Sequence, residues 1–184
     1  DSDADEVIAK VTDAKKGWVH LANSYEEALE YLRGQVPIVS QLGLVVKDKT
    51  DPDGNVIGKK KRLVLDAKRS RANDLARALQ NITLPRPANA VDDLIFLLDY
   101  IDRHGLHDHG VEQLVADYVD AYWLMPLHFE ERRFQVAKWK DAYLIFRRTG
   151  QGTRASSLTW GHLSALVSRL TQAGFDTTEL RLQV

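Results

Sequence analysis

"PIVSQLGLVVKDKTDPDGNVIGKKKRLVLDA", residues 37–67, has a strand–turn–strand pattern. Both of its ends are rich in branched apolar residues, which suit a pleated strand. Its centre, DPDGN at 51–55, is a dense turn signal, because proline presets a turn angle and glycine tolerates the angles that other residues avoid. We therefore predict a long β-hairpin over residues 38–66.

The second half of this hairpin and the residues after it are strongly basic. Seven cations fall within thirteen residues: Lys59, Lys60, Lys61, Arg62, Lys68, Arg69 and Arg71. Lysine and arginine side chains on a hairpin can hold phosphate groups through charge-assisted hydrogen bonds. An ordinary solvated face has the same composition, so both interpretations stay open at this point.

The segments around the hairpin alternate between helical and strand-like patterns. Ser24 and Glu27 form the S-x-x-E start of a helix that stops at Gly34. Further elements are predicted as helices at 71–80, 90–105 and 158–175, as strands at 111–119 and 179–184, and as a second hairpin around Lys140-Asp141. The buried side of the last helix is expected to carry Trp160, Leu163, Leu166, Val167 and Leu170. With a polar lead-in over 1–23, this order favours an α+β fold.

The composition is that of an ordinary globular domain. The 184 residues carry a net charge of −1, which hides an acidic start, "DSDADE", and the basic hairpin. Cysteine is absent, so disulfides and cysteine-based zinc sites are excluded. Because no apolar run reaches the length of a membrane span, we expect no membrane partner and an intracellular, cytoplasmic protein.

The stretch VADYVDAYWLMPL, residues 115–127, places a carboxylate at the end of a predicted strand. Asp117 ends the apolar run, and Asp120 follows on the next turn. A sheet fixes the position of residues at its strand ends, so such a place suits a metal-binding carboxylate. A solvated aspartate has the same signature, and D-x-x-D alone does not separate the two.

The loop QGTRASS, residues 151–157, precedes the last predicted helix. Gly152 allows the backbone to approach a ligand closely. Gln151 can hydrogen-bond a sugar or a base, and Arg154 can meet a phosphate near the helix N-terminus, which favours anions. A plain loop with a helix cap is the alternative, because the loop matches no phosphate-binding fingerprint.

In this order, the segments from about Ser24 to Val184 resemble the reverse transcriptases of retrotransposons and retroviruses. VADYVDAYWLMPL resembles the first catalytic motif of the palm, D-x-x-x-A-[YF]. RLVLDAKRS, with the lysines before it, looks like the fingers strand that holds the incoming triphosphate, and RRTGQGTRASSLTW looks like the second palm motif. The resemblance implies the right-hand fold of polymerases, with fingers over 24–110 and a partial palm over 111–184. The palm is expected to be an antiparallel sheet with packed helices.

The resemblance also implies a reaction, in which a primer 3′-hydroxyl attacks the α-phosphate of a deoxynucleotide with the help of two Mg²⁺ ions. Asp117 would be the catalytic metal ligand, joined by the Tyr118 carbonyl. Tyr122 would pack under the sugar and exclude a 2′-hydroxyl. The implied nucleotide-binding residues are Lys59, Lys61, Arg62, Asp120, Ala121, Tyr122, Gln151 and Gly152.

Two departures from the family pattern affect these expectations. Ala155 and Ser157 stand where many relatives have glycine and proline. The second aspartate motif of the family, Y-x-D-D, would begin just past Val184, followed by the thumb and RNase H regions, so we expect these 184 residues alone to have negligible polymerase activity. The implied partners are an RNA or DNA template-primer, a dNTP and the remainder of a retroelement polyprotein. The alternative is a non-catalytic nucleic-acid-binding or structural remnant of a retroelement.

Overall fold

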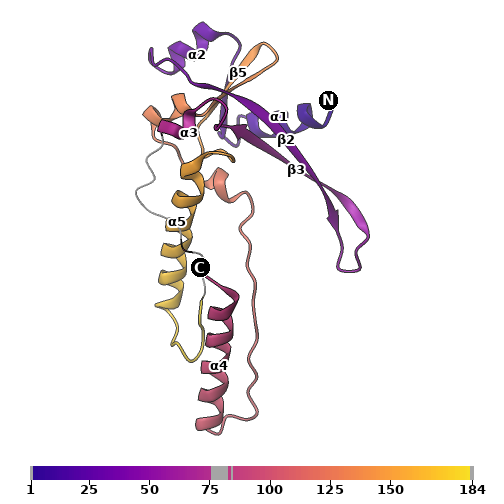
Figure 1. The fold of residues 1–184 in the computed structure, drawn as a ribbon, viewed down its shortest axis with the longest axis vertical. Coiled ribbons are helices and arrows are strands. Elements are labelled where there is room, and N and C mark those ends of the chain that lie inside the picture. Colours follow the sequence, from indigo (N-terminus) through magenta and orange to yellow (C-terminus); the bar gives the residue numbers. More distant parts are fainter. Residues whose placement is uncertain (1, 76–82, 84, 183–184) are drawn as a thin grey trace. The chain divides into compact units, whose positions relative to one another are not determined.

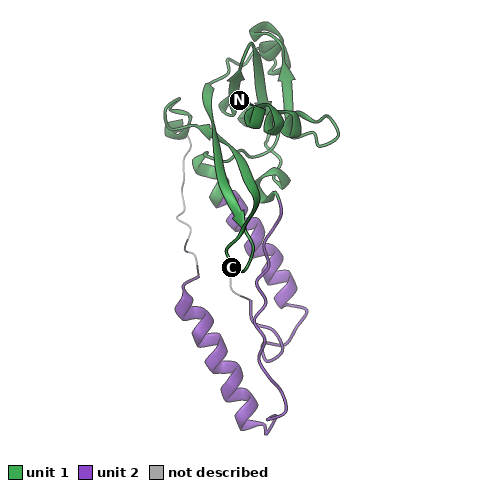
Figure 2. Cartoon of the chain, turned by 90° about the vertical axis from the view of Figure 1, so that its right-hand side faces the viewer, with its two compact units in different colours: residues 1–79, 120–157 green, residues 80–119, 158–184 purple. Residues whose placement is uncertain are grey.

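The computed structural model describes residues 2–75, 83 and 85–182 (Figure 1). The chain divides into two compact units (Figure 2). Unit 1 comprises residues 1–79 and 120–157, and unit 2 comprises residues 80–119 and 158–184. All five strands belong to unit 1.

The sheet is mixed, with the strand order β1-β5-β4-β2-β3. Its strands are β1 (Val19–Ala22), β2 (Val39–Thr50), β3 (Val56–Asp66), β4 (Val136–Trp139) and β5 (Ala142–Phe146). The α+β class is therefore confirmed. The expectation of a wholly antiparallel sheet is wrong, because β2 runs parallel to β4 at Val39 and Ser40. A parallel pair needs a long connection, and here the chain from 51 to 135 provides it, a pairing that neighbouring hairpin patterns do not reveal.

The predicted hairpin over 38–66 is confirmed, and so is the second one, formed by β4 and β5. Beyond Ser40, β2 pairs only with β3, so residues 41–66 form a two-stranded ribbon that we call the hairpin arm (Figure 1). At its tip the Asp51 carboxylate accepts a hydrogen bond from the Asn55 amide at 2.8 Å. Gly54 takes a positive φ of 86° there, which explains why the turn needs glycine.

Residues 1–23 are not merely a polar lead-in, because they form the helix α1 (Ser2–Thr12) and β1. Val7, Ile8 and Val11 lie on one side of α1 and are buried in the main core together with Leu63 of β3. Three apolar residues at helical spacing are enough to anchor the helix. The acidic residues that precede them, Asp3, Asp5 and Glu6, dominate the composition of this segment, which is why its pattern predicts a polar lead-in.

The helix α2 (Tyr25–Tyr31) confirms the predicted helix at 24–34. The Ser24 hydroxyl accepts a hydrogen bond from the Glu27 amide at 3.1 Å, as the capping pattern requires. The Glu27 carboxylate accepts from the Asn23 amide at 2.7 Å, one residue before the position expected for a capping box. Ala28 and Leu32 are fully buried in a second apolar cluster against β4 and β5.

A stack of three aromatic rings joins distant parts of unit 1. Trp123 lies in a short 3-10 helix, η1 (Ala121–Leu124), with its ring centroid 5.0 Å from that of Trp18 and 5.6 Å from that of Phe146. The three rings are nearly parallel, with interplanar angles of 15° and 17°. Burial of such large rings contributes strongly to a core, so η1 is held firmly against β5 and the start of β1.

Two further short helices complete unit 1. The 3-10 helix η2 (Phe129–Phe134) precedes β4, and the short helix α3 (Ala72–Leu75) follows β3. The helix predicted at 71–80 is confirmed only as α3, because residues 76–80 lie outside the described part of the chain.

The two long helices are α4 (Pro87–Arg103) and α5 (Arg154–Gln172). They confirm the helices predicted at 90–105 and 158–175, although α5 begins four residues earlier. Leu166 and Leu170, expected to be buried, are 53% and 67% exposed, and Val167 is also exposed. Helical periodicity identifies an apolar stripe but not whether anything covers it, and no described residue buries these three.

The strand predicted at 111–119 is wrong. Residues 111–118 are extended, but they pair with no strand of the described chain, and the side chains of Leu114 and Val115 are 91% and 83% exposed. An apolar, strand-like run becomes a strand only where a neighbour takes its backbone hydrogen bonds.

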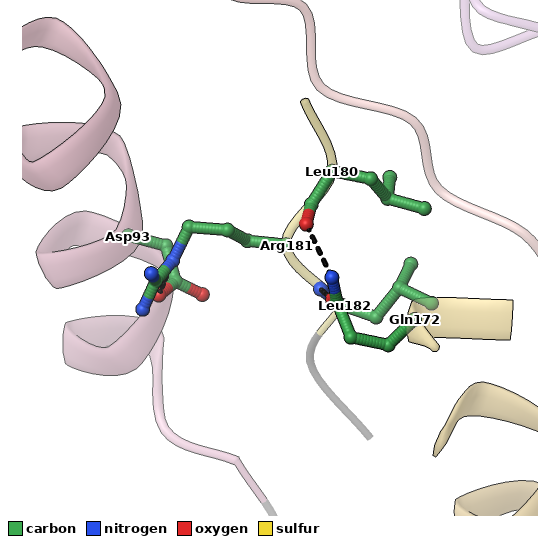
Figure 3. A network of polar contacts seen from close by, with 5 residues as sticks. All are labelled: Asp93, Gln172, Leu180, Arg181 and Leu182. Carbon is green, nitrogen blue, oxygen red and sulfur yellow. Dashed lines mark hydrogen bonds and ion pairs between the residues drawn. The ribbon is translucent and has the colours of Figure 1, made fainter. Parts of the chain in front are cut away.

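The strand predicted at 179–184 is also not observed at residues 179–182, and residues 183–184 are outside the described range. The Gln172 side chain instead donates to the Leu180 carbonyl at 2.7 Å and accepts from the Leu182 amide at 3.1 Å (Figure 3). Arg181 pairs with Asp93 of α4 at 2.5 Å. The Gln172 side chain thus occupies two backbone groups, the Leu180 carbonyl and the Leu182 amide, that a strand would use for pairing. No helix of the described chain has the length and apolarity needed to cross a bilayer.

The aromatic stack predicts a large effect of Trp123→Ala. The substitution removes the central ring and leaves a cavity, so the free energy of unfolding should fall by about 3–5 kcal/mol. Leu124→Ala, at the adjacent exposed position of η1, is the matched control and should cost less than about 1 kcal/mol. Chemical denaturation of both variants checks this, and equal losses would contradict the assignment of Trp123 as the anchor.

Candidate nucleotide and nucleic-acid site

The loop at 149–153 runs against the free edge of β3. The Leu65 amide donates to the Gln151 carbonyl at 2.8 Å. Gly152 has a φ of +100°, and a β-carbon there would lie 2.1 Å from the Leu65 carbonyl oxygen and 2.9 Å from Val64. Only glycine fits so close an approach. The structure therefore places Gln151 and Gly152 directly beside the base of the hairpin arm.

Buried polar side chains hold this loop in shape. The Gly150 amide donates to the side-chain oxygen of Gln135 at 2.8 Å, and the buried Ser156 hydroxyl donates to the Gly150 carbonyl at 2.7 Å. Thr153 completes the network through its hydroxyl contact with Ser156. A loop with its polar groups satisfied inside the protein presents its remaining backbone in one defined conformation.

Asn73 of α3 caps the start of α5 from a distant part of the sequence. Its side-chain oxygen accepts from the Arg154 amide at 2.8 Å, and its amide group donates to the Gly152 carbonyl at 3.3 Å. Sequence reasoning missed both Asn73 and Gln135, because their roles depend on contacts made far along the chain. Arg154, predicted to meet a phosphate, is exposed at this helix start.

Tyr122 lies beside the first turn of α5, which follows the same loop. Its hydroxyl lies 3.4 Å from the Ser157 hydroxyl, and the buried neighbour Trp123 fixes the turn that carries it. Asp120 precedes η1 with a φ of +55°, a left-handed conformation that few residues other than glycine adopt. Its carbonyl accepts from the Trp123 amide at 2.8 Å, so Asp120 acts on the backbone here. Ala121, between them, is half-buried.

The hairpin arm has two different faces, because side chains alternate along a strand. Lys59 and Lys61 share a face with the buried Leu63 and Leu65, and we call this the α1 face. Arg62 lies on the opposite face together with Val64, against which Gly152 packs, and we call this the loop face. The three cations predicted to bind one triphosphate are thus divided between two faces, and only Arg62 faces the side of Gly152.

On the α1 face, Lys61 is already neutralised. The Lys61 ammonium pairs with Asp3 at 3.0 Å and Glu6 at 2.5 Å, and only 18% of its side chain is exposed. The hydrogen bonds that Lys61 donates to Glu6 and Asp3 raise the pKa of Lys61, and the bond to Asp3 lowers the pKa of Asp3. Lys59 adds a further positive charge near Asp3 and stands opposite Asp48 on β2. Lys61 is therefore a structural contact of α1 in this conformation.

On the loop face, the cations are not neutralised. Register pairs Lys47 with Lys60 and Val45 with Arg62, so these side chains emerge on the same side of the ribbon, as does Lys49. All four cations are exposed, and none forms an ion pair with a carboxylate of the described residues.

Asp117 and Tyr118 belong to unit 2, whereas Asp120 and Tyr122 belong to unit 1. Asp117 is exposed on the extended segment, not at a strand end. Tyr118 packs edge-on against Trp160 of α5, with centroids 5.0 Å apart. Within the described residues, no three histidine or carboxylate side chains group closely enough to hold a metal ion, so the residues present do not make a complete magnesium site.

Comparison of the chain with known protein families, with curated proteins and with solved structures gave no match.

The close approach at Gly152 predicts that Gly152→Ala will be severely destabilising. The left-handed φ costs about 1 kcal/mol, and the overlap with the Leu65 carbonyl adds about 1–3 kcal/mol. Gly54→Ala is the matched control, since Gly54 also has a positive φ but has open space around its α-carbon. Thermal and chemical unfolding should show a clearly larger loss for Gly152, and equal losses would mean that the loop moves away from β3.

The contact between α1 and Lys61 predicts a pH dependence of stability. Because folding lowers the pKa of Asp3, its ion pair stabilises the protein fully above the ordinary carboxyl pKa of about 4 and is lost as the pH falls through the lowered value. The stability difference between the parent and Lys61→Met should therefore stay constant from neutral pH down to about pH 4 and shrink below it. Lys60→Met, on the loop face, should show no such trend, and a pH-independent difference for Lys61→Met would contradict the ion pair.

Proposed function

We propose that this chain is the fingers and part of the palm of an RNA-directed DNA polymerase of the retroelement type. The observation that carries the proposal is the convergence of three distant segments in unit 1. The loop at Gly152 packs on Val64, Arg62 shares the face of Val64, and Tyr122 reaches Ser157 in the first turn of α5, which directly follows that loop. These are the segments in which the sequence resembles the nucleotide-binding motifs of reverse transcriptases.

In this proposal, each group has a separate task toward the incoming nucleotide. Arg62 neutralises the triphosphate as a planar donor whose charge does not depend on pH. The rigid backbone at Gln151 and Gly152 offers a close, flat approach to the sugar and base. Tyr122 excludes a 2′-hydroxyl, the group that distinguishes RNA from DNA precursors. Asp120 and Ala121 position the backbone of η1 below Tyr122.

The magnesium ions of such an enzyme enter the proposal only through Asp117 and the Tyr118 carbonyl. Mg²⁺ prefers hard oxygen ligands of this kind and would stabilise the transferring phosphate. Since the described residues do not form a complete site, the proposal assigns no further metal ligand and no reaction step to this chain. The remaining parts of the enzyme, together with a template-primer, belong to the proposal as partners in a retroelement polyprotein.

Primer extension by the longest natural chain that contains residues 1–184 tests this function. Asp117→Asn should abolish template-dependent dNTP incorporation. Tyr122→Val should raise ribonucleotide incorporation relative to dNTP by about tenfold or more, the factor that corresponds to 1.4 kcal/mol of lost discrimination. The control is Tyr25→Val, a tyrosine on α2 that packs edge-on against Tyr143.

The selectivity of the Tyr25→Val control should stay at the parent value. Unchanged selectivity in Tyr122→Val would remove Tyr122 from the site. Absence of any incorporation, together with salt-dependent nucleic-acid binding, would instead favour a non-catalytic binding module, for which the unpaired cations of the loop face are the specific support.

A further inference from the structure

The loop face of the hairpin arm presents its cations as a ladder. Lys47 and Lys60 stand directly opposite each other, Arg62 lies two residues along β3, and Lys49 lies two residues along β2 in the direction of the tip. Residues two apart on a strand are separated by about 6.6 Å. The four charges therefore extend along the arm instead of gathering at one point.

This arrangement of charges fits a chain of phosphates better than a single phosphate. A compact anion would use two or three cations that converge on one position. A ladder of cations along an extended ribbon matches a linear polyanion, whose successive phosphates can meet successive levels of the ladder: Lys49, then the pair Lys47 and Lys60, then Arg62. Val45, Val56 and Val64 are apolar members of the same face, Asp66 is an acidic member at the base of the arm, and no aromatic ring lies among its strand residues to stack on a base.

The opposite face of the same ribbon provides an internal comparison. Its cations, Lys59 and Lys61, have carboxylates nearby from α1 and β2. A polyanion that approached this face would have to compete with Asp3 and Glu6. The field of the arm is thus directed to the loop face, although both faces have lysines in the sequence.

We infer that the loop face of the hairpin arm binds the sugar–phosphate backbone of one extended nucleic-acid strand, with Lys47, Lys49 and Lys60 on its phosphates and with Arg62, at the end nearest the loop, joining them when no nucleotide is bound. Recognition is through phosphate, so it is independent of base sequence and is shared by RNA and DNA. The inference deepens the proposed function, because it assigns the strand partner of the polymerase, but the binding itself requires neither a nucleotide nor catalysis.

The test is fluorescence anisotropy of the full 184-residue chain with labelled 20-nucleotide oligouridylate and oligothymidylate, without dNTP or divalent metal, between 50 and 200 mM KCl. Four phosphate contacts to a single strand give a slope of log K against log salt of about −3. Lys47→Gln/Lys60→Gln should reduce the magnitude of the slope by about 1.4, because two contacts are lost.

Two matched controls remove the same charge elsewhere. Lys59→Gln/Lys61→Gln changes the α1 face of the same strand, and Lys10→Gln/Lys15→Gln changes exposed lysines of and near α1. Both control variants should bind with a salt slope close to that of the parent. Lys10→Gln/Lys15→Gln remains a valid control even if Lys59→Gln/Lys61→Gln weakens the attachment of α1.

Several outcomes would overturn the inference. The first is an equal reduction of the salt slope in the three double variants. The second is binding of only one of the two oligonucleotides, and the third is tighter binding of a duplex of the same length than of either single strand. Failure of primer extension with the expected salt slopes would reject the polymerase and keep the strand-binding face. Normal primer extension, together with a parent-like salt slope in Lys47→Gln/Lys60→Gln, would keep the polymerase and reject the strand-binding face.

Discussion

The stacking of Trp123 between Trp18 and Phe146 is the interaction on which the rest of unit 1 depends. It ties a short, irregular turn to the centre of the sheet, where no ladder of backbone hydrogen bonds could hold it. Leu127 and Arg147 then continue the attachment through their backbones, at 3.0 Å. Tyr122 is the neighbour of Trp123 in η1, and its hydroxyl lies 3.4 Å from that of Ser157 in the first turn of α5. A rigid core thus supplies the precision that a binding site on turns would otherwise lack.

Charge segregation is the second organising feature. The hairpin arm carries lysines on both faces, yet α1 brings carboxylates to only one of them. Exposed ion pairs stabilise a fold little, so the main consequence of this arrangement is the direction of the electric field. An almost neutral protein thereby presents a locally cationic surface, which the net charge of −1 does not reveal.

The sequence was informative where local chemistry decides structure. The turn at 51–55, the Ser24 cap and the apolar periodicity of α4 each depend on residues close together in the chain, and the structure has all three. It was misleading where the structure of a segment depends on contacts with another segment. The run at 111–119 has strand-forming residues, but pairing requires a neighbour, and α5 has an apolar stripe that no described residue covers.

The candidate site follows the same rule. Gln151 and Gly152 could be selected from their loop, but Asn73 and Gln135, which hold that loop, come from segments without any distinguishing pattern. The division of Lys59, Lys61 and Arg62 between two faces follows from strand alternation, yet it needs the position of α1 to become meaningful. Composition alone made the three cations look equivalent.

The contact of Gly152 with β3 limits the substitutions that this position can accept during evolution. Every amino acid that a single base change can place at a glycine codon carries a β-carbon, and at this position that atom would overlap the Leu65 carbonyl oxygen. No one-step mutation therefore preserves the geometry. Among distant relatives of this chain, a glycine two residues before an α5-like helix start would be a more durable marker of the loop than the small residues that follow it.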